Sequence, residues 1–174
     1  IYLPKYNGSI FELMSAPISA FEIVIGYAGA AASKSILISI LILLTSTIFV
    51  DFYIKHPLLM VLLLVITSIT FSLFGFIIGI WATNFEKLQL IPLIIITPLV
   101  FLGGSFYSIS MLPELWQLVT KFNPIFYIIN GFRWSFFGTS DIDLFTSLSL
   151  IVIFLFICLA IIGLIFKTGY RIKG

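Results

Sequence analysis

The stretch LFTSLSLIVIFLFICLAIIGLIF, residues 144–166, decides the fold, because it runs for 23 residues without a charged side chain. An α-helix rises about 1.5 Å per residue, so about 20 mostly apolar residues cross the hydrocarbon core of a bilayer, which is roughly 30 Å thick. The length and composition of this stretch therefore predict a transmembrane helix over residues 144–166.

The composition of the whole chain points to the same environment. Of the 174 residues, 61% are hydrophobic and 9% are charged, whereas soluble domains have about 45–50% and about 25%. Glycine and proline are too few and too irregularly spaced for a fibrous or disordered chain. We therefore predict an all-α integral membrane protein whose surface contacts the lipid bilayer.

Three other stretches with few charges predict membrane spans, which gives four transmembrane helices in total. They are residues 23–50, 58–82 and 88–102. The first contains Lys34, whose long side chain can reach the headgroups. The third contains Pro92 and Pro98, which predict kinks.

A GxxxG motif, Gly75 and Gly79, lies in the predicted span over residues 58–82. Small residues let helices approach closely in lipid, so we expect these glycines to pack helices within the bundle, with dimerisation as the alternative. We expect Leu63, in the same span, to face lipid.

The basic residues predict the orientation of the chain. Five of them flank one side of the predicted spans: Lys5, Lys87, Lys167, Arg171 and Lys173. Three flank the other side, spread through more loop: Lys55, Lys121 and Arg133. Because Lys and Arg concentrate in cytoplasmic loops, we place residues 1–22 and the tail 167–174 in the cytoplasm.

The residue types within the chain exclude several kinds of chemistry. The predicted spans contain no Asp, Glu, His or Arg, whereas proton pumps and ion-driven transporters place such groups in the membrane. A single cysteine, Cys158, and a single histidine, His56, cannot form a metal cluster, and no phosphate-loop motif occurs. The net charge of +2 gives no reason to expect a nucleic-acid partner. We expect no enzyme and no cofactor in this chain, so that energy for any transport comes from another subunit.

The segment before the first predicted span indicates a docking element. Ser9 and Glu12 have capping-box spacing, and Ile10, Leu13 and Met14 would share one face of a short helix that ends near Pro17. We interpret it as a contact for a cytoplasmic partner with Glu12 as its polar group; the alternative is a helix that lies on lipid.

Residues 103–143, between the last two predicted spans, have a mixed character. Gly103–Pro113 is rich in turn residues, a helical pattern follows over Glu114–Phe122, and Asn123–Pro124 interrupts the pattern. The apolar run over residues 125–137 is too short to cross, and runs of this length are more often re-entrant or interfacial. We expect this connection to dip into the bilayer and cap a pathway from outside; the alternative is a surface loop resting in the headgroups.

These segments together resemble the permease subunits of the ABC-2 transporter family, in particular its bacterial inner-membrane branch. The resemblance depends on a succession of short motifs: Glu12–Pro17, Leu102–Ser108, Leu112–Pro113, Asn123–Pro124 and Gly131–Arg133. It implies a homodimer in the plasma membrane that works with cytoplasmic ATPase subunits, which bind the ATP and magnesium.

The resemblance also implies roles for individual residues. It implies that one set couples the chain to the ATPase: Glu12, Leu13, Met14, Ser15 and Pro17. It implies that a second set forms short external helices over the exit: Gly103, Gly104, Phe106, Tyr107, Asn123 and Pro124. Family members have six spans, so the four predicted here would match the third to the sixth, and we expect a C-terminal fragment that does not transport by itself.

The sequence therefore favours a permease subunit of an ABC exporter. The rival hypothesis is a non-transporting membrane scaffold or assembly factor, and the presence or absence of a neighbouring ATPase gene discriminates between them.

Overall fold

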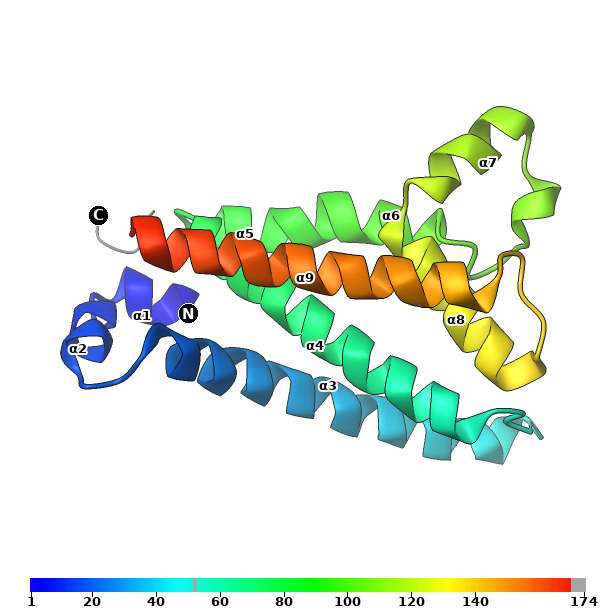
Figure 1. Ribbon diagram of the computed structural model, residues 1–174, viewed down its shortest axis with the longest axis horizontal. Coiled ribbons are helices and arrows are strands. Elements are labelled where there is room, and N and C mark those ends of the chain that lie inside the picture. The colour runs from blue at the N-terminus through cyan, green and yellow to red at the C-terminus, as the bar shows by residue number, and fades with distance from the viewer. Residues whose placement is uncertain (52, 170–174) are drawn as a thin grey trace.

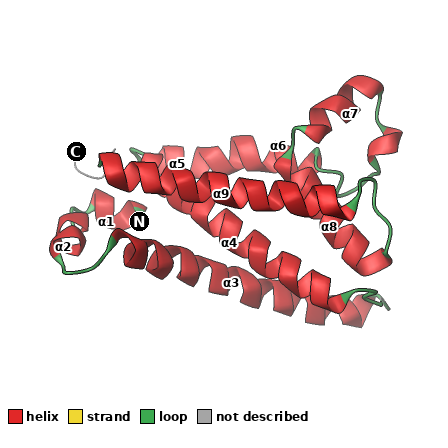
Figure 2. Cartoon of the chain, in the orientation of Figure 1, coloured by secondary structure: helices red, strands yellow, loops and turns green. Residues whose placement is uncertain are grey.

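The computed structural model describes residues 1–51 and 53–169, and all regular secondary structure within these ranges is helical. Figure 2 shows the helices joined by short loops and turns. Three helices are long and apolar enough to cross a membrane: α3 (Ala20–Phe49), α4 (Pro57–Trp81) and α9 (Leu144–Thr168). These helices extend along the long axis of the molecule (Figure 1). They confirm the all-helical fold and correspond to the spans predicted over residues 23–50, 58–82 and 144–166.

The fourth predicted span, residues 88–102, is helical but not one regular helix. It consists of α5 (Phe85–Ile91), a π-helical turn (Pro92–Ile96) and α6 (Thr97–Phe101). The N–H of Thr97 donates to the carbonyl of Pro92, five residues earlier, which is the π-helical pattern. The prolines thus interrupt the α-helical bonding without reversing the chain, and no piece alone has the length of a span. A four-span topology stays a prediction.

The segment before α3 forms two short helices, α1 (Tyr2–Tyr6) and α2 (Ile10–Ser15). Helix α2 ends where predicted, because Ala16 precedes Pro17 and is extended. The predicted capping box at Ser9 and Glu12 is wrong, since the Ser9 side chain makes no capping bond.

A capping box with the same spacing begins α3 instead. The Ser19 hydroxyl accepts from the Glu22 N–H at 3.2 Å, and the Glu22 carboxylate accepts from the Ser19 N–H at 2.6 Å. Two of the unpaired N–H groups at the start of α3 are satisfied in this way.

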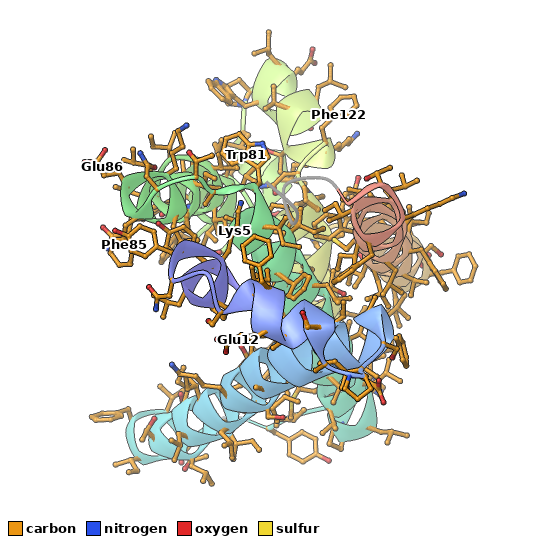
Figure 3. The ribbon with its side chains drawn as sticks, turned by 90° about the vertical axis from the view of Figure 1, so that its left-hand side faces the viewer. Lys5, Glu12, Trp81, Phe85, Glu86 and Phe122 are labelled. Carbon is orange, nitrogen blue, oxygen red and sulfur yellow. The ribbon has the colours of Figure 1, made fainter. Side chains whose placement is uncertain are left out.

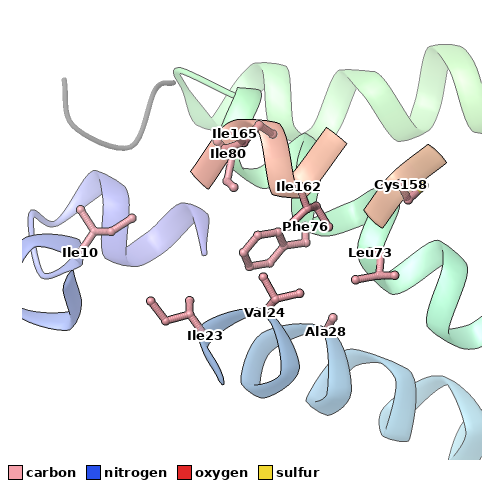
Figure 4. Close-up of a cluster of buried hydrophobic side chains, with 10 residues drawn as sticks. All are labelled: Ile10, Ile23, Val24, Ala28, Leu73, Phe76, Ile80, Cys158, Ile162 and Ile165. Carbon is pink, nitrogen blue, oxygen red and sulfur yellow. The ribbon is translucent and has the colours of Figure 1, made fainter. Parts of the chain in front are cut away.

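The larger buried cluster joins the N-terminal segment to the three long helices (Figure 4). Its members come from α2, α3, α4 and α9: Ile10, Ile23, Val24, Ala28, Leu73, Phe76, Ile80, Cys158, Ile162 and Ile165. The cluster holds one end of the bundle together, and we call this the α2 end.

A smaller cluster lies toward the opposite end, which we call the α7 end. Leu63, Ile128 and Ile151 form it, and they come from α4, α8 (Pro124–Phe137) and α9. Leu63 has no exposed surface, so the prediction that it faces lipid is wrong. Its side chain also lies 3.2 Å from the place where Gly131 would carry a Cβ, which lets α8 approach α4 closely.

The two glycines of the GxxxG motif have different surroundings. A Cβ on Gly79 would lie 2.8 Å from Ile1 Cγ2 and 3.7 Å from the Tyr2 nitrogen. A Cβ on Gly75 would meet nothing within 4 Å. Gly79 therefore contacts the N-terminal segment rather than another long helix, and Gly75 borders a groove of about 400 Å³.

The connection between α6 and α9 forms three helical pieces at the α7 end. They are a 3-10 helix (Ile109–Met111), α7 (Glu114–Lys121) and α8. Figure 1 shows α7 projecting away from the long helices, whereas α8 turns back toward them. Helix α8 has 14 residues, about 21 Å at the usual rise, which is too short to cross a bilayer.

Candidate functional site

The predicted functional residues gather at the two opposite ends of the bundle. Figure 3 looks onto the α2 end, where the N-terminal segment lies across the long helices. Lys5 fixes α1 there, because its Nζ donates to the carbonyls of Ile80 at 2.6 Å and Ala82 at 3.4 Å. These carbonyls lie at the C-terminus of α4, where the helix leaves acceptors unpaired. The Tyr2 ring, 6.2 Å from the Phe85 ring, adds an aromatic contact to the start of α5.

Helix α2 presents two different faces. Ile10 is 3% exposed and belongs to the larger cluster, and Leu13 packs against that cluster. Phe11 is 56% exposed, and Glu12 is exposed beside it. The apolar face that the sequence offered to a partner is thus used within this chain, and the outward surface is formed by Phe11 and Glu12.

The remaining residues assigned to coupling contribute less to that surface. The Ser15 hydroxyl donates to the Phe11 carbonyl at 2.7 Å, which satisfies it within α2. Pro17 is exposed just after the helix. Met14 lies in α2, but its side chain is outside the described part of the structure.

At the α7 end, the paired glycines shape the turn after α6. A Cβ on Gly103 would lie 2.8 Å from Ile129 Cδ1 and 3.0 Å from the Leu99 carbonyl oxygen, so any larger residue here would have to displace one of these groups. Gly104 has a φ of 82°, in the left-handed region that glycine adopts without strain.

The two aromatic residues of this turn lie differently. Phe106 is 77% exposed and stacks on Phe101, with ring centroids 5.7 Å apart. The Tyr107 hydroxyl is buried and finds no hydrogen-bond partner among the described residues. The turn therefore has an apolar outer edge and a buried polar group beneath it.

Asn123 and Pro124 begin α8, and Asn123 ties this helix to α6. The Asn123 side-chain oxygen accepts from the Ile125 N–H at 3.0 Å, and its amide donates to the Leu99 carbonyl at 2.6 Å. Pro124 occupies the first turn of α8, where a missing N–H costs nothing. The predicted interruption at Asn123–Pro124 is confirmed as the junction between α7 and α8.

The other end of α8 holds the loop between α3 and α4. The N–H groups of Lys55 and His56 donate to the carbonyls of Phe136 and Ser135 at 3.1 and 2.9 Å. The sequence does not predict this contact, because nothing in a short loop containing one histidine reveals which helix end the loop meets.

The family model described as ABC-2 type transporter matches residues 1–137. The chain belongs to the ABC-2 type transporter family. The matched residues include both α2 and the whole α6–α8 connection.

Curated relatives of this ABC-2 chain carry a transport name. It is 38% identical over 151 residues to the inner membrane transport permease YadH of Escherichia coli (strain K12), and equally to that of Shigella flexneri. The alignment includes 87% of this chain and 59% of each relative. The chain therefore spans about three-fifths of the length of these relatives. No solved structure matches it significantly.

Family membership and the apolar helices together make this ABC-2 chain a multi-pass membrane protein. Within the described residues, no three His, Cys, Asp or Glu side chains come together in a way that could hold a metal ion. The residues that the sequence predicts to be functional lie on α2, just after it, and in the connection at the α7 end.

Proposed function

We propose that this chain forms part of the transmembrane subunit of an ABC exporter in the bacterial inner membrane. ATP hydrolysis in separate cytoplasmic ATPase subunits would drive the transport, and these subunits would bind the ATP and magnesium. The permease would act as a homodimer without chemistry or a cofactor of its own. The family match and the printed name of the relatives, transport permease, support this proposal.

One observation carries the coupling part of the proposal, namely the position of Ile10. Its side chain is buried in a cluster that includes residues of α3, α4 and α9. A protein interior is close-packed and transmits displacement with little compression. A partner that moves α2 would therefore move the ends of three long helices together.

The outward face of α2 supplies what such a partner can recognise. Phe11 offers an exposed aromatic ring and Glu12 an exposed carboxylate. Aromatic residues are enriched at protein interfaces, and a carboxylate accepts charge-assisted hydrogen bonds from basic side chains or backbone N–H groups. In this proposal, the α2 end faces the cytoplasm.

The α7 end would then face outside, with the turn at Gly103 and Gly104 and the start of α8 over the exit of the pathway. The close approach of Gly103 to Ile129 supports a defined cap rather than a loose surface loop. Phe106, on the exposed edge of that turn, would line its outer rim.

Site-specific cross-linking tests the proposal in the full-length protein. A photoreactive maleimide is attached to a single cysteine in a Cys158→Ser background, at Glu12→Cys or, as the matched control, at Lys121→Cys. Cross-linking of the ATPase encoded beside the permease at position 12 and not at position 121 is expected. Cross-linking at position 121 alone would contradict the orientation. If the full-length permease neither binds an ATPase nor stimulates its hydrolysis of ATP, the scaffold hypothesis is favoured.

A further inference from the structure

Arg133 and Asp141 form an ion pair at the α7 end that the proposed function leaves without a role. The Arg133 Nη1 and Asp141 Oδ2 atoms are 2.7 Å apart, and the side chains are only 24% and 15% exposed. Arg133 lies on α8, and Asp141 lies in the connection from α8 to α9. The two charges are therefore largely removed from water and depend on each other for compensation.

Arg133 uses its second nitrogen to hold the turn that follows α6. Its Nη2 donates to the carbonyl of Gly104 at 2.6 Å and approaches that of Tyr107 at 3.3 Å. The planar guanidinium carries several donors in a fixed arrangement, so it can bind a carboxylate and backbone carbonyls at once. A lysine or a neutral amide in its place could not reproduce all of these contacts.

Asp141 binds the same turn at two further positions. Its carboxylate accepts from the Ser108 hydroxyl and from the Ile109 N–H, the latter at 3.1 Å. Its own N–H donates to the side-chain oxygen of Asn130, at 2.9 Å. Asn130 is 1% exposed and lies on α8, which fixes the position of the Asp141 backbone.

These contacts join the turn over residues 103–112 to α8 and to the 138–143 connection that follows α8. Beyond the turn, α7 contributes little to this attachment, since its apolar residues Leu115 and Leu118 are 69% and 59% exposed. The position of the turn therefore depends on the polar contacts of Arg133 and Asp141, on the packing of Gly103 and on the stacking of Phe106 against Phe101.

We propose that Arg133 and Asp141 form a latch that holds the 103–112 turn closed against α8, with Arg133 as its positioning residue. Separating the pair would leave two partly buried charges to be hydrated and would free the Gly104 and Tyr107 carbonyls together. Such an arrangement favours two discrete positions of the turn rather than gradual displacement. A role of the latch at the exit of a transport pathway rests on the proposed function. Its role in holding the turn against α8 does not.

Cysteine accessibility in the full-length permease tests the latch without requiring an ATPase. Ile109 is 9% exposed, so a cysteine at this position, in a Cys158→Ser background, reports release of the turn to an impermeant maleimide. The measurement is the labelling rate in nanodiscs, compared among Arg133→Gln, Asp141→Asn and the double variant. Lys121→Gln, which removes an exposed charge on α7, is the control.

We expect labelling at least tenfold faster in both single variants, no change in Lys121→Gln, and no further increase in the double variant. Arg133→Lys, which keeps the charge but loses the planar donor arrangement, should fall between wild type and Arg133→Gln. Unchanged rates in the single variants would overturn the latch, as would effects that multiply in the double variant, because independent groups behave in that way. Thermal unfolding of each sample separates local release from general misfolding. Faster labelling together with no ATPase association would retain the latch and reject the proposed function.

Discussion

The imidazole of His56 lies nearly flat against the indole of Trp134, with ring centroids 4.3 Å apart and 14° between the ring planes. His56 belongs to the loop between α3 and α4, and Trp134 belongs to α8. Two backbone hydrogen bonds accompany the stacking. The loop is thus attached to the C-terminal end of α8, as the turn over residues 103–112 is attached to its middle.

The first prediction is that His56 and Trp134 stabilise the fold as a pair. Stacked aromatic pairs contribute about 0.5–1.5 kcal/mol beyond the area that they bury. A double-mutant cycle with His56→Ala and Trp134→Ala should return a coupling free energy in that range, measured by chemical unfolding in detergent. The same cycle with His56→Ala and Trp116→Ala, on the projecting helix α7, should return a value near zero. Equal couplings in the two cycles would contradict the pairing.

The second prediction compares two glycines whose surroundings in the structure differ. Gly103→Ala should destabilise the protein, because its Cβ would enter space held by Ile129 and by the Leu99 carbonyl. Overpacking of this kind costs about 1–3 kcal/mol. Gly75→Ala should be neutral or slightly stabilising, since nothing lies within 4 Å and alanine favours the helix. Thermal stability of both variants in the same detergent checks this order, and the reverse order would contradict it.

The third prediction concerns neighbouring leucines of α4. Leu63 is fully buried, whereas Leu62 is 47% exposed. Leu63→Ala should cost about 2–5 kcal/mol, as large-to-small core changes do, because its packing contacts with α8 and α9 are lost. The half-exposed Leu62 side chain makes fewer contacts within the protein, so Leu62→Ala should cost much less stability. If unfolding in mild detergent gives equal losses for the two variants, α8 does not pack on α4 through Leu63.

Leu63 also shows what the sequence could and could not predict. The length of an apolar stretch with few charges is enough to place three long helices, because the thickness of the bilayer sets the length of any span. In lipid, however, buried and lipid-facing positions are both apolar, so composition does not reveal which face of α4 meets α8. That information lies in the tertiary contacts themselves, here the approach of Gly131 to Leu63.

The two Ser-x-x-Glu sequences show a second limit. Ser9–Glu12 and Ser19–Glu22 have the same spacing, but Ser9 is helical, with a ψ of −7°, whereas Ser19 is extended, with a ψ of 154°. Only an extended N-cap residue directs its side chain toward the free N–H groups. The spacing predicts a possible cap, and the backbone before the helix decides whether it forms.

The sequence predicts the order of elements in the connection between α6 and α9, but not the hydrogen bonds that hold this connection in place. Turn residues, a helical pattern over Glu114–Phe122 and the interruption at Asn123–Pro124 predict the elements between α6 and α9. The partners of Arg133 could not be found in this way, because Gly104 and Asp141 lie 29 and 8 residues away from it. Arg133 contacts the backbone carbonyls of Gly104 and Tyr107, and the side chains of these two residues do not indicate the contact.

The fourth prediction is a dependence of stability on pH through Asp141. Burial raises the pKa of this carboxyl, but hydrogen bonds from Ser108 and the Ile109 N–H, with the charge of Arg133, outweigh it, so the pKa falls below its ordinary value of 3.8. A carboxylate with a lowered pKa stabilises the folded state above its unfolded pKa, and this contribution disappears as the pH falls through the folded pKa. The difference in melting temperature between wild type and Asp141→Asn should be constant from about pH 5 to 7 and shrink below about pH 4. A difference that persists unchanged at the lowest pH would exclude the carboxylate as its source.

The last prediction separates the two faces of α2 within the proposed coupling role. Glu12 faces outward, so Glu12→Ala should weaken association with the ATPase and leave membrane insertion and thermal stability unchanged. Removing one partner of a buried, charge-assisted hydrogen bond at an interface costs about 2–5 kcal/mol, much of it from the group left unpaired. A helix resting on lipid would tolerate the same change, because its carboxylate would face water.

Ile10 faces inward, so a change at this residue should affect the transmission of movement from α2 to the long helices rather than the association of the permease with the ATPase. Ile10→Val removes one methylene from the cluster shared by α3, α4 and α9, which typically costs about 0.5–1.5 kcal/mol of stability without touching the partner. We expect ATPase to co-purify normally with this variant, while stimulation of hydrolysis by cargo in nanodiscs falls. Glu12→Ala should instead lose co-purification at equal expression.

Because the two residues lie only two positions apart on one short helix, a general disruption of α2 would give both variants the same defects. Identical losses of association and stimulation in both would therefore reject the division of roles, and unchanged behaviour of Glu12→Ala in both assays would return α2 to the role of a helix that lies on lipid.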